Sequence, residues 1–424
     1  MAVVEVSYGE TWNAAEQRIV GPLSRSQAAA RDAQGAQYSV VLQAPGRPQP
    51  SAVLNVCWEQ HYLGIWAYDE YGRRWREVDL RRLEPGRLFL CHMTQWCYES
   101  PGMAEFADDA GRSSVDLGPD GTGRRTVRPR GNRGPSTWTD ADVPDGVKWV
   151  PAPDFGEWTA LFGALGGGEA LDVVLRDAPV ASSDARGAPG PGWKPPTGMR
   201  PRHVNEMFTV GSAFSSASDR QTGSWVVQQV REAGPLRLPT GRVLACDPGW
   251  GWLERGDGYT VTVAPGSYPV EIARAAYASG SRGAGLHRAE TVAARLVISG
   301  RPAVSWEPAL QQGNDPRLLR NGEYFGFGVD SGAGCFVDAS AVKRLGDQYD
   351  QQMTAPGEYA GELDPDGVAE LVDPLTGANL VAFPSGTGGG SYPVWIGRDA
   401  DGEVACFVAD MLVLHRSELL RRRP

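Results

Sequence analysis

Short apolar or alternating runs, separated by turn residues, fill the segment from residue 51 to residue 98. A period of two sends successive side chains to opposite faces of a strand, so one face of each run meets a core. Gly72 and the pair of Pro85 and Gly86 supply the backbone conformations that tight turns need. The pattern predicts an antiparallel β-meander. Its strands are expected at residues 53–58, 62–68, 75–80 and 87–90.

Two segments have helical rather than alternating character. Residues 24–34 are rich in alanine and begin with Ser24, whose side chain is suited to cap the first turn of a helix. Residues 338–349 begin with polar capping residues and continue with helix formers. The rest of the second half reads as further strands. These are expected at residues 259–264, 268–273, 291–299, 392–396 and 404–414.

Length and composition favour two β-rich domains. The chain has 424 residues, more than the roughly 250 to 300 at which a single core stops growing. Its 54 Gly and 32 Pro indicate many turns and argue against a helical bundle. We expect an α+β, β-rich fold with a β-meander domain at 1–177, a Pro/Gly-rich linker at 178–201 and a second domain at 202–424. Each domain is expected to have a mainly antiparallel sheet with a few short helices.

Charge and the spacing of reactive residues narrow the function classes. The formal charge of −10 argues against nucleic-acid binding, because gripping a phosphate backbone needs a basic surface. The chain shows no leader pattern and no long apolar run, and its six cysteines form no Cys-x-x-Cys pair, so we expect a cytoplasmic, membrane-free protein with reduced thiols. The five histidines are isolated and the glycine run at 386–390 lacks the lysine of a P-loop, so neither a metal nor a cofactor is predicted.

Residues 111–146 are rich in Gly, Pro, Asp, Ser and Arg, with few apolar anchors, which predicts a mobile loop or hairpin. Five arginines fall within ten positions of it. They either hold an acidic partner or are neutralised by nearby acids, and neutralisation is the favoured interpretation. The arginines are Arg124, Arg125, Arg128, Arg130 and Arg133, and the acids are Asp108, Asp109, Asp116, Asp120, Asp140 and Asp142.

Five ordered motifs in the second half carry a resemblance. They are LPTGRVLACDP at 238–248, PGSYPV at 265–270, VSWE at 304–307, GVDSGAGCFVD at 328–338 and SYPVWIGRDADG at 391–402. In this order they resemble the bacterial family known as domain of unknown function 4241, over about residues 236–414. The resemblance implies no reaction. It points by association to the setting of bacterial immunity, defence and toxin-neighbourhood proteins.

A glycine-rich stretch brings four candidate catalytic residues together, Asp330, Ser331, Cys335 and Asp338. A nucleophile needs a base and hydrogen-bond donors for the developing oxyanion. The most specific form of this hypothesis has Cys335 as the nucleophile and His287 as its base. The structural alternative, which is favoured, makes Cys335 a buried strand end and Asp338 a cap. A pair of carboxylates is the other enzymatic hypothesis. Its members are drawn from Glu271, Glu307, Asp330 and Asp338.

Aromatic residues supply the candidate binding positions. Trp250 and Trp252 lie on glycines in the loop PGWGW at 248–252, where exposure and partner contact are expected. The run GSYPV occurs at 266–270 and again at 390–394. Either two related strand edges line one groove, or the two copies are only similar entries from a turn into a strand, and the second interpretation is at least as well supported. This repeat contributes Tyr268 and Tyr392, and Trp395 follows the second copy.

Three hypotheses follow from these residues. The first is a binding or accessory protein, associated with immunity or phage defence, that recognises a protein or small ligand through aromatic loops. The second is a small-molecule hydrolase or transferase with its site around Asp330, Ser331, Cys335 and Asp338. The third is a scaffold whose halves bridge other components. The absence of metal and phosphate motifs favours the first, and whether the protein is an enzyme stays open.

Overall fold

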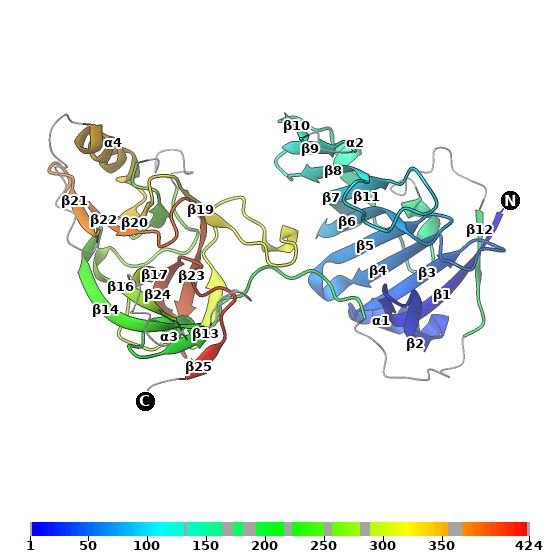
Figure 1. The fold of residues 1–424 in the computed structure, drawn as a ribbon, viewed down its shortest axis with the longest axis horizontal. Coiled ribbons are helices and arrows are strands. Elements are labelled where there is room, and N and C mark those ends of the chain that lie inside the picture. Colours follow the sequence, from blue (N-terminus) through cyan, green and yellow to red (C-terminus); the bar gives the residue numbers. More distant parts are fainter. Residues whose placement is uncertain are drawn as a thin grey trace. The chain divides into compact units, whose positions relative to one another are not determined.

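The computed structural model describes residues 2–130, 134–162, 173–180, 192–215, 223–249, 257–279, 289–354 and 367–421. Contacts between Cα atoms divide the chain into two compact units, Met1–Pro196 and Thr197–Pro424. Both units consist mainly of antiparallel sheet with a few short helices (Figure 1), which confirms the β-rich α+β class. Among the described residues, no helix is long and apolar enough to cross a bilayer. The division into independently folding domains stays a prediction.

A single twelve-stranded sheet forms the N-terminal unit. Its main path runs β10-β9-β8-β7-β6-β5-β4-β3-β1-β12, with β11 beside β7 and β2 beside β1. All neighbours are antiparallel except β1 and β12. The strands are β1 (Ala2–Asn13), β2 (Arg18–Leu23), β3 (Tyr38–Gln43), β4 (Ala52–Cys57), β5 (Tyr62–Tyr68), β6 (Arg74–Glu84), β7 (Arg87–Cys97), β8 (Gly111–Leu117), β9 (Gly123–Arg128), β10 (Ser136–Asp140), β11 (Trp149–Pro151) and β12 (Val173–Asp177).

The predicted meander and the first predicted helix are confirmed. Strands β4 to β7 follow the alternating runs, and Pro85 and Gly86 form the two-residue turn between β6 and β7, where Gly86 has φ of 75°. Helix α1 (Arg25–Gln34) begins after Ser24, whose side chain accepts from the Gln27 N–H in a capping box. The other helical segments are short. They are η1 (Trp58–Gln60), α2 (Asp145–Lys148) and η2 (Trp158–Leu161).

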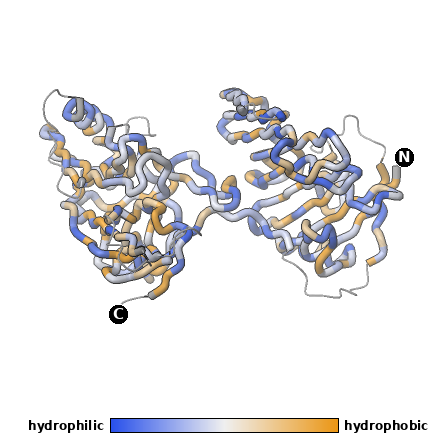
Figure 2. Tube along the Cα trace, in the orientation of Figure 1, coloured by the Kyte–Doolittle hydropathy of each residue, from blue (hydrophilic) through white to orange (hydrophobic). Residues whose placement is uncertain are grey.

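The two faces of this sheet differ in chemistry. One face carries a large core that α1 and η2 cover through Ala28, Trp158 and Leu161. On the opposite face, a small apolar cluster surrounds Trp12 and Tyr68, and the positions over β6 to β9 are polar or aromatic. Figure 2 shows the apolar residues gathered along the strands. One face therefore stabilises the unit, and part of the other is available for a ligand.

The C-terminal unit combines a nine-stranded and a four-stranded sheet, with orders β18-β23-β24-β17-β16-β14-β13-β25 (β19 beside β23) and β15-β20-β22-β21. The strands are β13 (Ala213–Ser215), β14 (Gly223–Leu238), β15 (Val243–Cys246), β16 (Gly266–Ser279), β17 (Glu290–Val297), β18 (Ser305–Pro308), β19 (Gly326–Val329), β20 (Ala333–Asp338), β21 (Ala369–Val372), β22 (Asn379–Pro384), β23 (Gly390–Arg398), β24 (Val404–Asp410) and β25 (Leu419–Arg421). The helices are α3 (Val204–Met207), η4 (Pro316–Leu318) and α4 (Val342–Thr354).

The GSYPV repeat lies on two strands of the same sheet, β16 and β23. In each copy the proline stands one residue before the ladder with a neighbouring strand begins, at Val270 opposite Leu296 of β17 and at Val394 opposite Ala409 of β24. Because proline has no N–H to donate, this offset lets it sit in a strand without breaking a ladder on that side. The closing hairpin of β23 and β24 is confirmed, and β24 is internal to its sheet.

Of the two alternatives expected at 111–146, the hairpin is found, because β8, β9 and β10 pair antiparallel in sequence and hydrogen bonding to β7 extends the sheet through these polar strands. Two other sequence expectations need correction. Residues 259–264 form no strand beyond an isolated bridge of Tyr259 with Gln311. Helix α4 starts at Val342, since Asp338 is still the last residue of β20.

Candidate functional site

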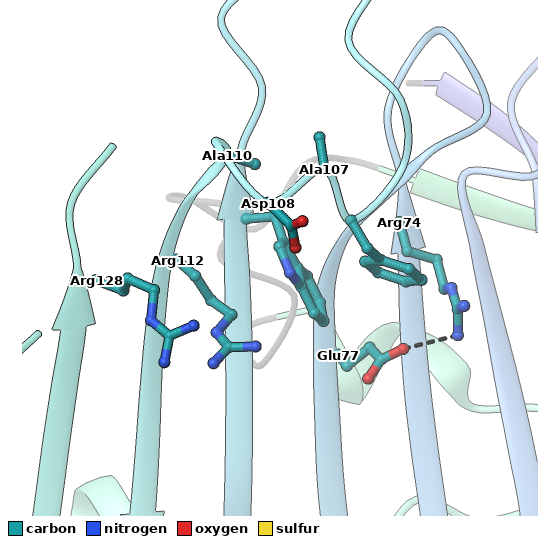
Figure 3. Close-up of a pocket in the computed structure, with 9 residues that line it drawn as sticks. Arg74, Glu77, Ala107, Asp108, Ala110, Arg112 and Arg128 are labelled. Atoms are coloured by element: carbon teal, nitrogen blue, oxygen red, sulfur yellow. Dashed lines mark hydrogen bonds and ion pairs between the residues drawn. The ribbon is translucent and has the colours of Figure 1, made fainter. Parts of the chain in front are cut away.

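A pocket of about 280 Å³ lies on the polar face of the N-terminal sheet. Strands β6 to β9 form its floor, and residues 98–110, which connect β7 to β8, cover it. Figure 3 shows Arg128 and Arg112 on neighbouring strands at one end of the pocket and Glu77 with Arg74 at the other. The lining residues are Arg74, Glu77, Trp96, Phe106, Ala107, Asp108, Ala110, Arg112 and Arg128.

Strand register places two arginines directly opposite each other. Arg112 of β8 pairs with Arg128 of β9, and Arg112 also faces Trp96 of β7. Both arginines are exposed, and neither makes a hydrogen bond or ion pair with a described residue. Like charges directly opposite on adjacent strands are destabilising, by roughly 0.2 to 1 kcal/mol. The pair therefore favours an anion that both guanidinium groups can share.

Other arginines near the pocket are already neutralised. Arg124 lies 3.2 Å from the Asp116 carboxylate, and Arg130 pairs with Glu99. The sequence prediction of local neutralisation holds for Arg124 but fails for Arg128, because Arg128 is aligned with Arg112 instead of with an acid. Arg133 lies outside the described residues. Arg125 is also exposed without a partner among the described residues, but it lies on the opposite face of β9, so the unpaired arginines on the pocket face are Arg112 and Arg128.

Aromatic rings form one wall of the pocket. The ring centroids of Trp96 and Phe106 are 4.8 Å apart and tilted by 53°, and Phe106 remains 38% exposed. The Arg74 guanidinium lies 4.5 Å from the Phe106 ring centroid and 4.7 Å from that of Trp66. Such rings offer a large apolar surface to a flat ligand.

Two arginines at the start of β6 hold the covering loop in place. Arg74 donates to Glu77 at 2.7 Å and to Glu105 at 3.1 Å. Arg73 is buried, and its Nη1 donates to the carbonyl oxygens of Ser100 and Met103, both at 2.8 Å. The loop is thus attached to the sheet by charge-assisted hydrogen bonds, which are the stronger kind.

Two carboxylates line the pocket beyond the arginine pair, Glu77 beside Arg74 at the far end and Asp108 between Arg112 and Glu77 (Figure 3). Burial raises the pKa of Glu77, and the Arg74 charge acts against that rise. Asp108 is exposed and makes no hydrogen bond or ion pair with a described residue. The pocket therefore has an arginine pair at one end, an aromatic wall and two carboxylates, which suits a ligand with an anionic group, a flat ring and N–H donors.

A second polar array lies beside the pocket. His92 Nδ1 is 2.7 Å from Asp116 Oδ1, and its Nε2 is 2.8 Å from Thr94 Oγ1. Hydroxyl, imidazole and carboxylate follow the order found in nucleophilic triads. However, Thr94 is only 7% exposed and does not line the pocket. The array therefore links side chains of β7 and β8 by hydrogen bonds on the polar face, and we assign it no reaction.

The predicted catalytic residues lie in the C-terminal unit and do not share one surface. Asp330 and Ser331 are exposed, and their backbone N–H groups donate to the buried Asp247 carboxylate at 2.8 and 2.7 Å. Cys335 is fully buried in β20, with its Sγ 3.6 Å from Sγ of Cys246. His287, its suggested base, lies outside the described residues.

Three predicted acids have structural partners. Asp338 is fully buried and accepts four hydrogen bonds from the N–H and hydroxyl groups of Thr240 and Ser340. Glu271 pairs with Arg295, which lies directly opposite on β17. Glu307 pairs with Arg398. Their catalytic roles stay untested hypotheses.

The predicted aromatic binding residues also have neighbours of their own. Trp395 and Tyr392 are 1% and 3% exposed, and Tyr392 belongs to the main core of the unit. Tyr268 packs against that core and donates to the Ala264 carbonyl oxygen at 2.7 Å. Trp250 and Trp252 lie outside the described residues. Groove binding by these residues remains a hypothesis.

Sequence reasoning missed the pocket. The cluster of arginines in the segment 111–146 was visible in the sequence. Whether it forms an anion site depends on which arginines face each other across β8 and β9. That register follows from the pairing of β8 with β7, and half-polar strands do not reveal it through periodicity.

Fold and site together define a β-rich protein whose first unit carries an anion-favouring pocket. Residues 236–409 match the family described as Protein of unknown function (DUF4241), so the C-terminal half resembles this family, as its motifs predict. No curated protein and no solved structure matches the chain. The family match begins after the pocket residues, so it neither includes the pocket nor assigns it a role.

Proposed function

We propose that this protein is a binding protein whose N-terminal pocket holds a small ligand. An anionic group of the ligand lies between Arg112 and Arg128, and a flat ring lies against Trp96 and Phe106. The observation that carries this proposal is the direct pairing of two exposed arginines that have no acidic partner among the described residues. This is the binding function expected from the sequence, at a site that the sequence did not reveal.

Electrostatics supports an anion at this position. Arginine presents planar N–H donors that match carboxylate and phosphate oxygens in pairs. An anion between the two guanidinium groups replaces their repulsion by attraction, so binding and relief of repulsion act together. Since the pair is exposed, the interaction is expected to weaken as salt is added.

Phenyl phosphate is a direct probe because it carries both a dianionic group and a ring. Isothermal titration of the full chain at low salt is expected to show binding, and the double variant Arg112→Gln/Arg128→Gln is expected to lose at least tenfold in affinity. Arg125→Gln is the matched control. It removes the same charge from β9, on the sheet face opposite to the pocket.

Two outcomes would defeat the proposal. One is equal affinity of the wild type and the double variant for phenyl phosphate, and the other is no binding of phenyl phosphate by a wild type that unfolds cooperatively. A loss that occurs equally in Arg125→Gln would show a general charge effect and would also contradict a site at the arginine pair.

The proposed setting is the bacterial cytoplasm, with an association to immunity or phage defence. Only the reducing compartment has support in the structure: none of the six cysteines forms a disulfide, although Cys246 and Cys335 face each other across β15 and β20 with both sulfurs buried. Neighbouring thiols persist in reducing compartments. Mass spectrometry after alkylation of whole cells is expected to find both thiols reduced; a disulfide between them would contradict this setting.

A further inference from the structure

Resting on the proposed binding function, we infer that the ligand of the N-terminal pocket is a guanine nucleotide, with its phosphate at Arg112 and Arg128 and its base beside the carboxylates of Asp108 and Glu77. The inference comes from the order of chemistry across consecutive strands. Arg128 lies on β9, Arg112 on β8, Trp96 on β7 and Glu77 on β6, and all four line one pocket (Figure 3).

Strand spacing sets the length of the ligand. Neighbouring strands lie about 4.8 Å apart, and Glu77 is opposite Thr94, two residues along β7 from Trp96. Two to three spacings together with this offset separate the arginine pair from Glu77 by roughly 12 to 16 Å. A nucleoside monophosphate, with a ribose between phosphate and base, extends far enough to reach both ends. Inorganic phosphate reaches the cationic end only, and phenyl phosphate reaches the arginine pair and the aromatic wall but not Glu77, so both are expected to bind more weakly.

The middle of the pocket suits a planar base. Trp96 lies between the arginine pair and Glu77 in strand order, and Phe106 extends the aromatic surface from the covering loop. Nucleobases stack on such rings whatever their sequence identity, because every base has a π face. Stacking therefore favours a base but does not select one.

Selection of the base comes from the two carboxylates. Asp108 is exposed without a partner among the described residues, and Glu77 uses Oε1 for Arg74. Carboxylates accept N–H donors and repel lone pairs. Guanine presents a ring N–H next to an amino group, two adjacent donors that a carboxylate can accept together. Adenine presents an amino group next to an unprotonated ring nitrogen, so it matches poorly.

A free nucleotide is consistent with the charge of the protein. Polynucleotides require a basic surface that follows many phosphates, and a formal charge of −10 opposes such binding. One phosphate group needs only the local pair at Arg112 and Arg128. The prediction that the protein does not bind nucleic acid is therefore compatible with a mononucleotide ligand.

The test is isothermal titration of the full chain with GMP, AMP, ribose 5-phosphate and inorganic phosphate. GMP is expected to bind at least tenfold more tightly than AMP, because a charge-assisted hydrogen bond is at stake. Ribose 5-phosphate and phosphate are expected to bind more weakly than either nucleotide. All four are expected to lose affinity in Arg112→Gln/Arg128→Gln.

Asp108→Asn tests base recognition without touching the anion end. This change is expected to bring the GMP and AMP affinities within a factor of about three and to leave ribose 5-phosphate unchanged. The control is Asp109→Asn, an exposed neighbour that does not line the pocket. Glu77→Gln is the second variant, and it is expected to reduce the same preference.

The outcomes separate the two claims. If ribose 5-phosphate binds as tightly as GMP, or if AMP binds as tightly as GMP in the wild type, the inference of a guanine nucleotide is wrong. The proposed anion site at Arg112 and Arg128 is not contradicted by either result. The same holds if phenyl phosphate binds and GMP does not. If GMP binds the double arginine variant as tightly as the wild type, or if none of the anions binds, both claims fall.

Discussion

Asp338 shows how a candidate catalytic residue can be a structural one. Its buried carboxylate accepts four hydrogen bonds from Thr240 and Ser340. Asp338→Ala leaves those donors without partners, so we expect the free energy of unfolding in urea to fall by about 3 kcal/mol. The control Asp330→Ala removes an exposed side chain and keeps the backbone N–H that Asp247 accepts, so a change below about 0.5 kcal/mol is expected. Equal stability of both variants would refute this role.

Asp410, at the end of β24, is expected to make the stability of the folded protein depend on pH. Burial raises its pKa to about 6, and the Leu412 N–H at 2.9 Å acts in the opposite direction. Between about pH 4 and pH 6 the folded chain holds a proton that the unfolded chain releases, so stability falls as the pH rises through this range. The loss is expected to reach about 3 kcal/mol at pH 7.

The neutral variant Asp410→Asn isolates this effect. We expect it to match the wild type near pH 4 and to be more stable at pH 7, as measured by urea unfolding across the range. Asn retains an oxygen that can accept from Leu412, so the hydrogen bond is preserved. A stability difference that does not change with pH would contradict the assignment.

At this scale the sequence identifies residue types but not their surroundings. Cys335 was predicted as a buried strand end in its structural interpretation, and it is fully buried in β20. Arg112 was not predicted as a binding residue, because a single arginine on a polar strand indicates a ligand only when its cross-strand neighbour is known. The pocket depends on contacts between β7, β8 and β9 that no local pattern contains.

Elements with a clear apolar period were predictable, and polar ones were not. Strands β4 and β5 are almost entirely buried, so their side chains follow the hydrophobic pattern. Strands β8 to β10 have no buried residue and exist because each pairs with the strand before it. The segment 111–146 was therefore predicted as a loop or hairpin outside the sheet. The strands β8 and β9, which form part of the pocket floor, were not predicted as members of the sheet.

The covering loop provides a test at the scale of an element. Arg73 holds the loop through the carbonyl oxygens of Ser100 and Met103 without lining the pocket. Arg73→Lys cannot reproduce this fork of donors, so we expect residues 98–110 to exchange amide hydrogens faster and phenyl phosphate to bind about tenfold more weakly. Arg125→Lys serves as the control. Unchanged exchange in this loop would show that Arg73 does not hold it.

For the whole molecule, the buried residues form separate clusters in the two units. The clusters around Leu54 and Trp12 lie within Met1–Pro196, and those around Phe407, Val408 and Leu244 lie within Thr197–Pro424. Separate cores predict separate cooperative unfolding. Calorimetry of the full chain is expected to show two unfolding transitions. Phenyl phosphate is expected to raise the midpoint temperature of only one of them, that of the N-terminal unit. One indivisible transition would contradict two domains joined within residues 178–201.

The central claim is that Arg112 and Arg128 repel each other until an anion joins them. Thermal unfolding of the wild type and Arg112→Gln at low salt, with and without phenyl phosphate, tests it directly. Without ligand, the variant is predicted to be as stable as the wild type or more stable by up to about 1 kcal/mol. With ligand at about one hundred times its Kd, only the wild type is predicted to gain about 2.7 kcal/mol. A variant that is less stable without ligand, and that gains as much with it, would contradict the claim.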